Sequence, residues 1–204
     1  TCYMYGVFNS QLVVGNTSFN KMLTNTRNAL NVMKISGQRI YVKLEDGYYL
    51  LAVPSLFEMG FNYVRWYYKT STETFIITNY TTVDSPEVYL EVSAVSGKKY
   101  GYLVTNQVSM NDNEYERSFH MEQDGNTLLF RAHKDALNAQ VYPELLYRME
   151  IRDTPFRVQR EDEGASLVVL ELSPTHEWSL VIQGLLHGED VPFTRRDLDV
   201  AIKR

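Results

Sequence analysis

Short runs rich in Val, Ile, Thr, Tyr and Phe recur along most of this chain, and clusters of turn residues separate them. In residues 87–95 the apolar side chains occupy every second position, which is the period of a strand with one face in the core and the other in water. The alternating residues are Val88, Leu90, Val92 and Ala94, with Glu87, Tyr89, Glu91 and Ser93 between them. The recurrence predicts a single all-β domain in which two antiparallel sheets pack face to face as a sandwich.

The other strand-like runs follow at similar spacing. They predict strands at 62–69, 73–80, 100–107, 117–122, 127–132, 145–151, 166–172 and 177–183. A hairpin is predicted over 39–53, because Asp46-Gly47 supplies the positive φ that a tight reversal needs. Ser173-Pro174 is expected to end the strand 166–172, since proline cannot donate a hydrogen bond to a ladder.

Helical patterns occur in two places. Near the end of the chain Thr194 takes an N-cap position, Asp197 takes the capping-box position, and Leu198, Ala201 and Ile202 follow at helical spacing, which predicts a short C-terminal helix. Residues 18–34 carry apolar side chains at roughly helical spacing among many Asn and Thr. That pattern is compatible with a helix and does not decide for one.

Charge and cysteine content exclude several classes of protein. Asp and Glu number 25 against 20 Lys and Arg, for a net charge of −5, which argues against nucleic acid because phosphate neutralisation needs a basic face. No apolar run approaches the roughly 18 residues of a spanning helix, and the first residues lack the pattern of a signal peptide. The single cysteine, Cys2, cannot form an internal disulfide, so a cytoplasmic location without membrane contact is predicted.

The sequence carries no motif of a catalytic or cofactor site. The histidines His120, His133, His176 and His187 do not lie at metal-ligand spacing, and neither a nucleophile elbow nor a phosphate-binding glycine loop occurs. Acidic clusters such as 161–163 and 189–190 stand beside glycines, as solvated turns do. We therefore predict no catalytic residue, no metal and no cofactor in this chain.

Residues 61–69, FNYVRWYYK, place large rings on both faces of a predicted strand. Aromatic faces stack on sugars and neighbouring polar groups bind hydroxyls, while the same rings would equally fill the space between two sheets. Asn and Gln in nearby predicted loops add neutral donors and acceptors. The candidate saccharide-binding residues are Arg65, Trp66, Tyr68, Asn106 and Gln107. For Trp66 and for Trp178 the core position is favoured.

Four segments resemble a known family: 14–21 (VGNTSFNK), 61–70 (FNYVRWYYKT), 77–86 (ITNYTTVDSP) and 170–188 (LELSPTHEWSLVIQGLLHG). They look like the large β-sandwich domain ahead of the catalytic barrel in glycoside phosphorylases of the cellobiose phosphorylase family. The resemblance, strongest to the branch acting on β-1,2-linked glucans, runs from about Tyr5 to Asp190. It implies a mutarotase-like supersandwich, followed by a helical linker and an (α/α)6 barrel that holds the general acid and the phosphate site.

This resemblance implies a division of the chain and a role for it. Residues 1–192 would form the sandwich and 193–204 the start of the linker helix, so the chain alone would be a non-catalytic fragment. Its expected partners are the (α/α)6 barrel of the same parent, a glucan oligosaccharide and a second copy in a homodimer. Two alternatives stay open: a stand-alone carbohydrate-binding module, and a mutarotase-like sugar epimerase that uses histidine and glutamate on a concave sheet face.

Overall fold

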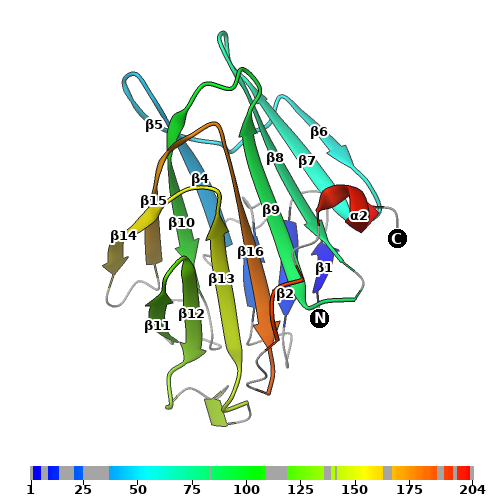
Figure 1. Ribbon diagram of the computed structural model, residues 1–204, viewed down its shortest axis with the longest axis vertical. Helices are drawn as coiled ribbons and strands as arrows, with labels where there is room; N and C mark the ends of the chain where they lie inside the picture. Colours follow the sequence, from blue (N-terminus) through cyan, green and yellow to red (C-terminus); the bar gives the residue numbers. More distant parts are fainter. Residues whose placement is uncertain are drawn as a thin grey trace.

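The computed structural model describes residues 2–5, 9–13, 21–24, 37–82, 84–108, 119–135, 139–140, 142–162, 167–187, 191–194 and 197–202. Two large antiparallel sheets face each other, which confirms the predicted sandwich (Figure 1). One has eight strands in the order β11 (Phe119–Asp124), β12 (Thr127–Ala132), β13 (Leu146–Arg152), β16 (Glu177–Leu185), β9 (Glu87–Ala94), β8 (Thr74–Thr81), β7 (Tyr63–Lys69) and β6 (Leu56–Met59). The other has five, in the order β14 (Phe156–Asp162), β15 (Leu167–Thr175), β10 (Tyr100–Gln107), β4 (Gly37–Leu44) and β5 (Gly47–Leu50).

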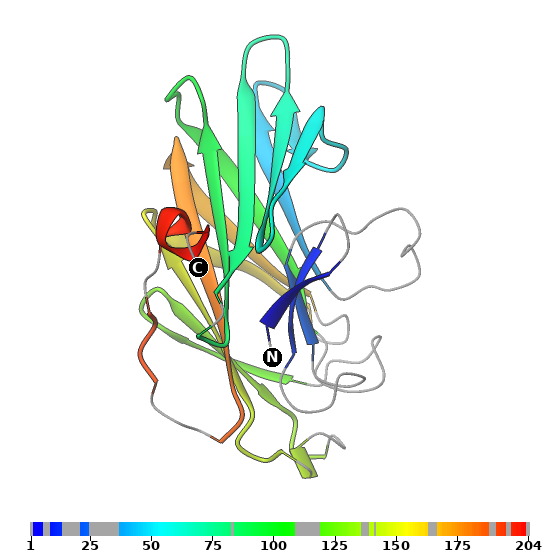
Figure 2. The same ribbon diagram turned by 90° about the vertical axis from the view of Figure 1, so that its right-hand side faces the viewer.

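The N-terminal part forms a third, smaller sheet that the sequence did not predict. Its strands are β1 (Cys2–Tyr5), β2 (Asn9–Val13) and β3 (Lys21–Thr24). Figure 2 shows these strands on one side of the molecule and the short helix α2 (Leu198–Ile202) on the other. Because β3 is a strand, a helix over 18–34 is wrong for Lys21–Thr24, and the rest of that segment lies outside the described residues.

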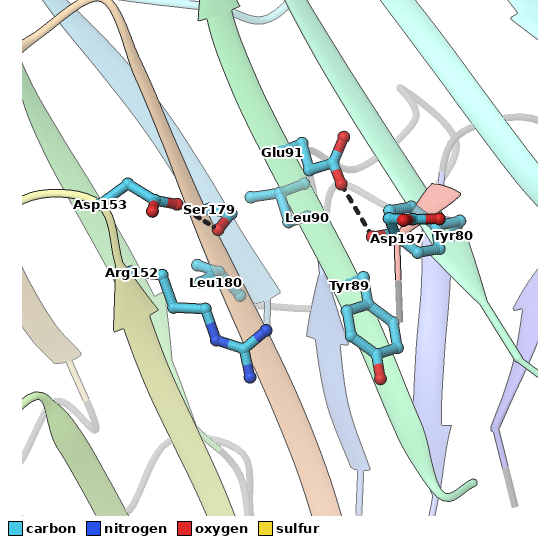
Figure 3. Close-up of a pocket in the computed structure, with 9 residues that line it drawn as sticks. All are labelled: Tyr80, Tyr89, Leu90, Glu91, Arg152, Asp153, Ser179, Leu180 and Asp197. Atoms are coloured by element: carbon cyan, nitrogen blue, oxygen red, sulfur yellow. Dashed lines mark hydrogen bonds between the residues drawn. The ribbon is translucent and has the colours of Figure 1, made fainter. Parts of the chain in front are cut away.

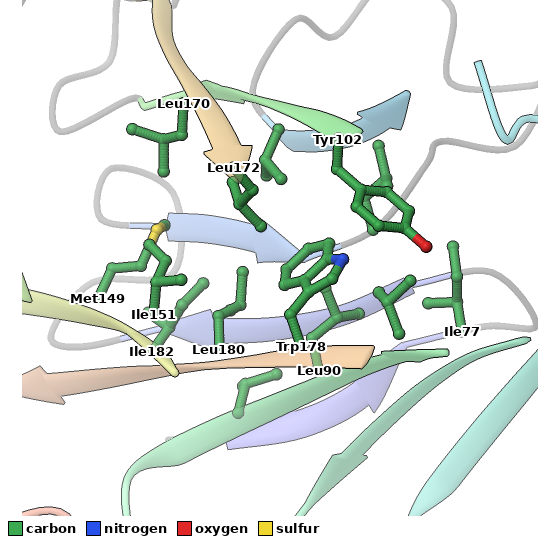
Figure 4. Close-up of a cluster of buried hydrophobic side chains, with 14 of the residues drawn as sticks. Ile77, Leu90, Tyr102, Met149, Ile151, Leu170, Leu172, Trp178, Leu180 and Ile182 are labelled. Carbon is green, nitrogen blue, oxygen red and sulfur yellow. The ribbon is translucent and has the colours of Figure 1, made fainter. Parts of the chain in front are cut away.

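Large side chains from both sheets fill the space between them (Figure 4). Trp178 of β16 meets Tyr102 of β10 edge to face, with ring centroids 5.7 Å apart. The predicted alternation places Val88, Leu90, Val92 and Ala94 in this core, and it places Trp66 there with 2% of its surface exposed. The period-two pattern of the sequence therefore identified the inner face of the large sheet correctly.

Two local predictions change in detail. The β4–β5 hairpin is confirmed, but its two turn residues are Glu45 and Asp46, and Gly47 already belongs to β5. The strand predicted to end at Ser173-Pro174 continues to Thr175. It does so because Ser173 and Pro174 stand together opposite a single residue of β10 in a bulge, a position that tolerates the missing N–H of proline.

The C-terminal segment begins its helix later than predicted. Asp197 is the N-cap of α2, since its side-chain oxygen accepts the N–H of Val200 at 2.9 Å. Thr194 instead binds the carboxylate of Glu87 through its backbone N–H and its hydroxyl. The C-terminal helix is thus confirmed, while the capping role assigned to Thr194 is wrong.

This contact also corrects the expectation that the polar side of β9 is wet along its whole length. Glu87 and Tyr89 are only 0% and 3% exposed, because the C-terminal segment covers them. Gln183 donates a further hydrogen bond to Glu87 at 3.0 Å, and the Tyr89 hydroxyl also binds it. A buried carboxylate with several donors thus fixes the C-terminal segment to the outer face of the large sheet.

We predict that Trp66→Ala lowers the free energy of unfolding by about 3–5 kcal/mol, because a fully buried ring is replaced by a cavity. Phe61→Ala, at a ring that is 95% exposed, is the matched control and should change stability by less than about 0.5 kcal/mol. Urea denaturation of both variants measures the difference. Equal midpoints for the two variants would contradict the core position of Trp66.

Candidate functional site

A row of polar side chains crosses the outer face of the eight-stranded sheet. Each member stands directly opposite the next on neighbouring strands, so the row follows from the strand register alone. We call it the polar row: Glu58 on β6, Arg65 on β7, Thr78 on β8, Glu91 on β9, Ser179 on β16 and Arg152 on β13. Neighbouring strands are about 4.8 Å apart, so the row is about 24 Å long.

Hydrogen bonds hold the β6 end of the row in place. The Glu58 carboxylate accepts from the hydroxyls of Tyr63 and Tyr67, at 2.6 and 3.1 Å, and from the Arg65 guanidinium at 3.4 Å. Arg65 also donates to the Thr78 hydroxyl at 3.2 Å. The hydrogen bond from Tyr63 outweighs desolvation and lowers the pKa of Glu58. This end of the row therefore carries a paired negative and positive charge.

The carboxylate at the centre of the row behaves in the opposite way. Glu91 is half-buried, and burial raises its pKa above the ordinary carboxyl value of 4.5. The Tyr80 hydroxyl donates to it at 2.8 Å and Arg65 acts on it electrostatically, and both of these effects oppose the rise. A carboxyl group with a raised pKa on a hollowed surface is a candidate functional group.

Two adjoining hollows, of about 240 and 370 Å³, open around Glu91. Glu91, Asp153 and Ser179 line both of them, so the hollows lie side by side. Figure 3 shows Glu91 with Tyr80 and Asp197 on one side and Asp153 with Ser179 and Arg152 on the other. The floor between them is the backbone of β9 and β16, together with Leu90 and Leu180.

Asp153 reaches the hollow from a tight turn after β13. Its φ is 67°, a left-handed conformation that Asp tolerates better than most residues. Its carboxylate accepts a hydrogen bond from the Ser179 hydroxyl at 2.9 Å, which orients both side chains. Backbone conformations of this kind are retained where the surrounding structure requires them, often beside a binding site.

The C-terminal segment forms a wall of the site. Phe193 lies over the guanidinium groups of Arg148 and Arg152, at 4.6 and 5.7 Å from the ring centroid. Arg152 also pairs with Glu150, with an Nε–Oε2 distance of 2.6 Å. Asp197, the cap of α2, lines the hollow from the same segment. The site is therefore assembled from the sheet and from residues that follow it in the sequence.

The site offers a ligand both donors and acceptors of hydrogen bonds. Carboxylates accept hydrogen bonds, guanidinium groups donate them, and the hydroxyls of Ser179 and Tyr80 do both. The two hollows are lined by Glu91, Asp153, Asp197 and Glu177 and by one cation, Arg152, so their charge does not favour a polyanion.

The residues selected from the sequence are divided among different places. Arg65 belongs to the polar row and is 26% exposed. Trp66 and Tyr68 point into the sandwich, with 2% and 7% exposed, so their rings offer no open face for stacking. Asn106 is buried, and its side-chain oxygen accepts from Gln38 at 2.7 Å. Gln107 lies on β10 opposite Leu167, on the other sheet from Arg65.

The sequence analysis did not select Glu91, Asp153, Ser179 or Arg152. The signal for Glu91 was present, since it lies on the polar side of the alternating run 87–95. Ser179 likewise stands between Trp178 and Leu180 in a strand that was predicted. What the sequence could not supply was the register that brings these positions into one line.

Histidines and acidic residues give no sign of a metal centre within the described ranges. No group of three or more His, Cys, Asp or Glu side chains there is arranged to hold an ion. His120 and His133 stack with ring centroids 4.2 Å apart, and His176 approaches Glu177 at 3.6 Å in the exposed turn between β15 and β16. No helix in the described part of the chain has the length and hydropathy needed to cross a bilayer.

Comparisons with known proteins give a consistent result. The family described as glycoside phosphorylase supersandwich domain matches residues 1–184. A 1,2-beta-oligoglucan phosphorylase from Listeria innocua serovar 6a is 36% identical over 195 residues, which are 93% of this chain and 18% of that protein. A solved polysaccharide lyase aligns with a TM-score of 0.50 at 9% identity, over 88% of this chain and 32% of its own, and this likeness concerns the fold alone.

We predict that Glu91→Gln makes the protein more stable at pH 7. The folded-state pKa of Glu91 is raised, so its ionised form is disfavoured by folding, and wild-type stability falls as the pH rises through that pKa. The amide keeps an acceptor for Tyr80 without the charge. Melting curves should therefore coincide near pH 4 and separate in favour of the variant at pH 7. A variant less stable than wild type at pH 7 would contradict this.

Proposed function

Because the chain belongs to the family of glycoside phosphorylase supersandwich domains, we propose that it acts as the non-catalytic sandwich domain of a longer phosphorylase of β-1,2-linked glucans. This proposal rests mainly on the 36% identity to a 1,2-beta-oligoglucan phosphorylase along nearly the whole chain. The chain spans only 18% of that relative. The reacting groups are therefore assigned to other parts of the parent protein.

We further propose that the polar row contacts the glucan. Support comes from the length of the row, its mixed donors and acceptors, and the adjoining hollows around Glu91. Within this proposal Arg65 keeps the binding role suggested by the sequence. The saccharide contacts suggested for Trp66, Tyr68, Asn106 and Gln107 remain predictions, to which the burial of Trp66, Tyr68 and Asn106 gives no support.

The remaining features of the parent protein are proposed in the same way. Its (α/α)6 catalytic barrel follows the sandwich, with residues 1–192 as the sandwich and 193–204 as the start of the linker helix. Phe193 and Thr194 support this reading, because they leave the sheet while remaining fixed to it. A cytoplasmic location remains proposed from the single cysteine.

A stand-alone carbohydrate-binding module is the second candidate, and the polar row is the observation that favours it. Binding of glucan by the chain alone is compatible with both candidates, so activity of the complete protein separates them. A mutarotase-like epimerase has less support. His176, which approaches the Glu177 carboxylate, lies in an exposed turn and not on a sheet face.

We predict that the 204-residue chain alone releases no sugar phosphate from β-1,2-gluco-oligosaccharides in phosphate buffer. The protein encoded by the complete gene should do so. A coupled assay of sugar phosphate measures both preparations. Turnover by the purified chain, abolished by a substitution within it, would contradict the non-catalytic assignment.

We also predict that Arg65→Ala weakens binding of β-1,2-gluco-oligosaccharide by about tenfold, the loss expected for one hydrogen bond to a charged group. The matched control is Arg157→Ala, which removes an arginine of the five-stranded sheet that is 73% exposed. Isothermal titration calorimetry of the complete protein gives the dissociation constant of each variant. The buffer contains no phosphate, so that no phosphorolysis takes place. If the two substitutions weaken binding equally, the polar row is not part of the binding site.

A further inference from the structure

Most of the exposed large apolar side chains in the described residues lie in one segment, from Tyr48 to Phe61, which we call the apolar edge. It runs from β5, the last strand of the five-stranded sheet, to β6, the last strand of the eight-stranded sheet. Val53 and Phe61 are 87% and 95% exposed, and Leu56 and Met59 are 60% and 58% exposed. Several exposed apolar side chains gathered in one segment, as in residues 53–61, mark an interaction site more often than an ordinary solvated surface.

Both faces of the strand β6 carry exposed apolar side chains. Phe57 stands opposite the core residue Trp66 and so lies on the inner side of the sheet, yet 47% of its surface is exposed. Leu56, on the other side of the strand, is exposed as well. The register pairs β6 with β7 alone among the described strands, which leaves one edge of β6 without a strand beside it. An exposed apolar edge strand promotes aggregation unless something covers it.

The edge presents almost no charge. Glu58 is the one charged residue in 48–61, and its carboxylate is bound by Tyr63, Tyr67 and Arg65 of the neighbouring strand. The matching partner is therefore an apolar surface, such as the apolar face of a helix, and not a charged polymer.

The position of the C-terminal helix indicates which molecule supplies that surface. Asn62, directly after Phe61, donates to the carbonyl of Ala201 in α2 at 2.8 Å and to that of Thr81 at 2.8 Å. Val200 and Ile202 on this helix are also exposed, at 43% and 39%. The helix thus brings the C-terminal end of the described chain beside the apolar edge (Figure 1).

We infer that the apolar edge docks against another domain of the same parent protein, through the apolar face of a segment that follows α2. This rests on the proposal that the chain is one domain of a longer phosphorylase. The related phosphorylase has more than four fifths of its length outside the region matched here, so such a protein holds ample chain to provide the cover. A segment tethered beside the edge also has a high effective concentration, which a second copy lacks.

The test is thiol labelling of the complete protein encoded by the gene. Phe61→Cys is compared with Val95→Cys, which replaces a residue that is 63% exposed in the turn after β9, outside the apolar edge. Mass spectrometry maps the maleimide adducts, and each rate is normalised to that of the same variant in urea. The normalised rate at Phe61→Cys should be at least about tenfold lower than at Val95→Cys, because a covered thiol reacts only during transient opening.

Equal normalised rates at the two sites overturn the inference, and so does a gene that ends at Arg204. Protection of Phe61→Cys that disappears on dilution to a monomer assigns the edge to a second copy and also overturns it. Phosphorolysis is measured on the same samples and reports on the proposed function separately. If the protein is active and Phe61→Cys reacts fully, only the docking inference is contradicted. If Phe61→Cys is protected and the protein is inactive, only the proposed function is contradicted.

Discussion

The packing of aromatic rings between the two large sheets determines the rest of this structure. Trp178 and Tyr102 meet across the gap between the sheets, and Trp66 fills the same layer nearer its edge. Because side chains alternate along a strand, each core side chain that points inward places its neighbours in sequence on the outer face. Arg65, Glu91 and Ser179 reach the outer face for this reason, and antiparallel register then lines them up.

The polar row combines two carboxyl groups whose environments act in opposite directions. Hydrogen bonds lower the pKa of Glu58, while burial raises that of Glu91. The first group stabilises the sheet edge, and the second is held at a cost to stability in the centre of a hollow surface. A half-buried carboxyl group in the hollowed part of the sheet makes Glu91 a candidate functional group, whereas the Glu58 carboxylate is already bound by Tyr63, Tyr67 and Arg65.

Fold and function are supported here by different observations. A likeness to a polysaccharide lyase at 9% identity shows that the sandwich recurs without a shared sequence, and by itself it assigns no activity. Family membership rests on the match along residues 1–184. The polar row and the apolar edge differ in chemistry and meet at Glu58 of β6.

The sequence alone predicted the sandwich, the family, the inward position of Trp66 and Trp178 and most strands of the two large sheets, because each depends on local alternation or on contiguous sequence segments. It did not predict the strands β1, β2, β3, β6 and β14. The tertiary structure decided what depends on distant partners. Register joined Arg65 and Glu91 into one row and placed Pro174 in a bulge, and the C-terminal segment buried Glu87 and made Asp197 the helix cap in place of Thr194. A period of two fixes which face a side chain takes, whereas its neighbours on that face come from strands far away in the sequence, and local pattern carries no information about them.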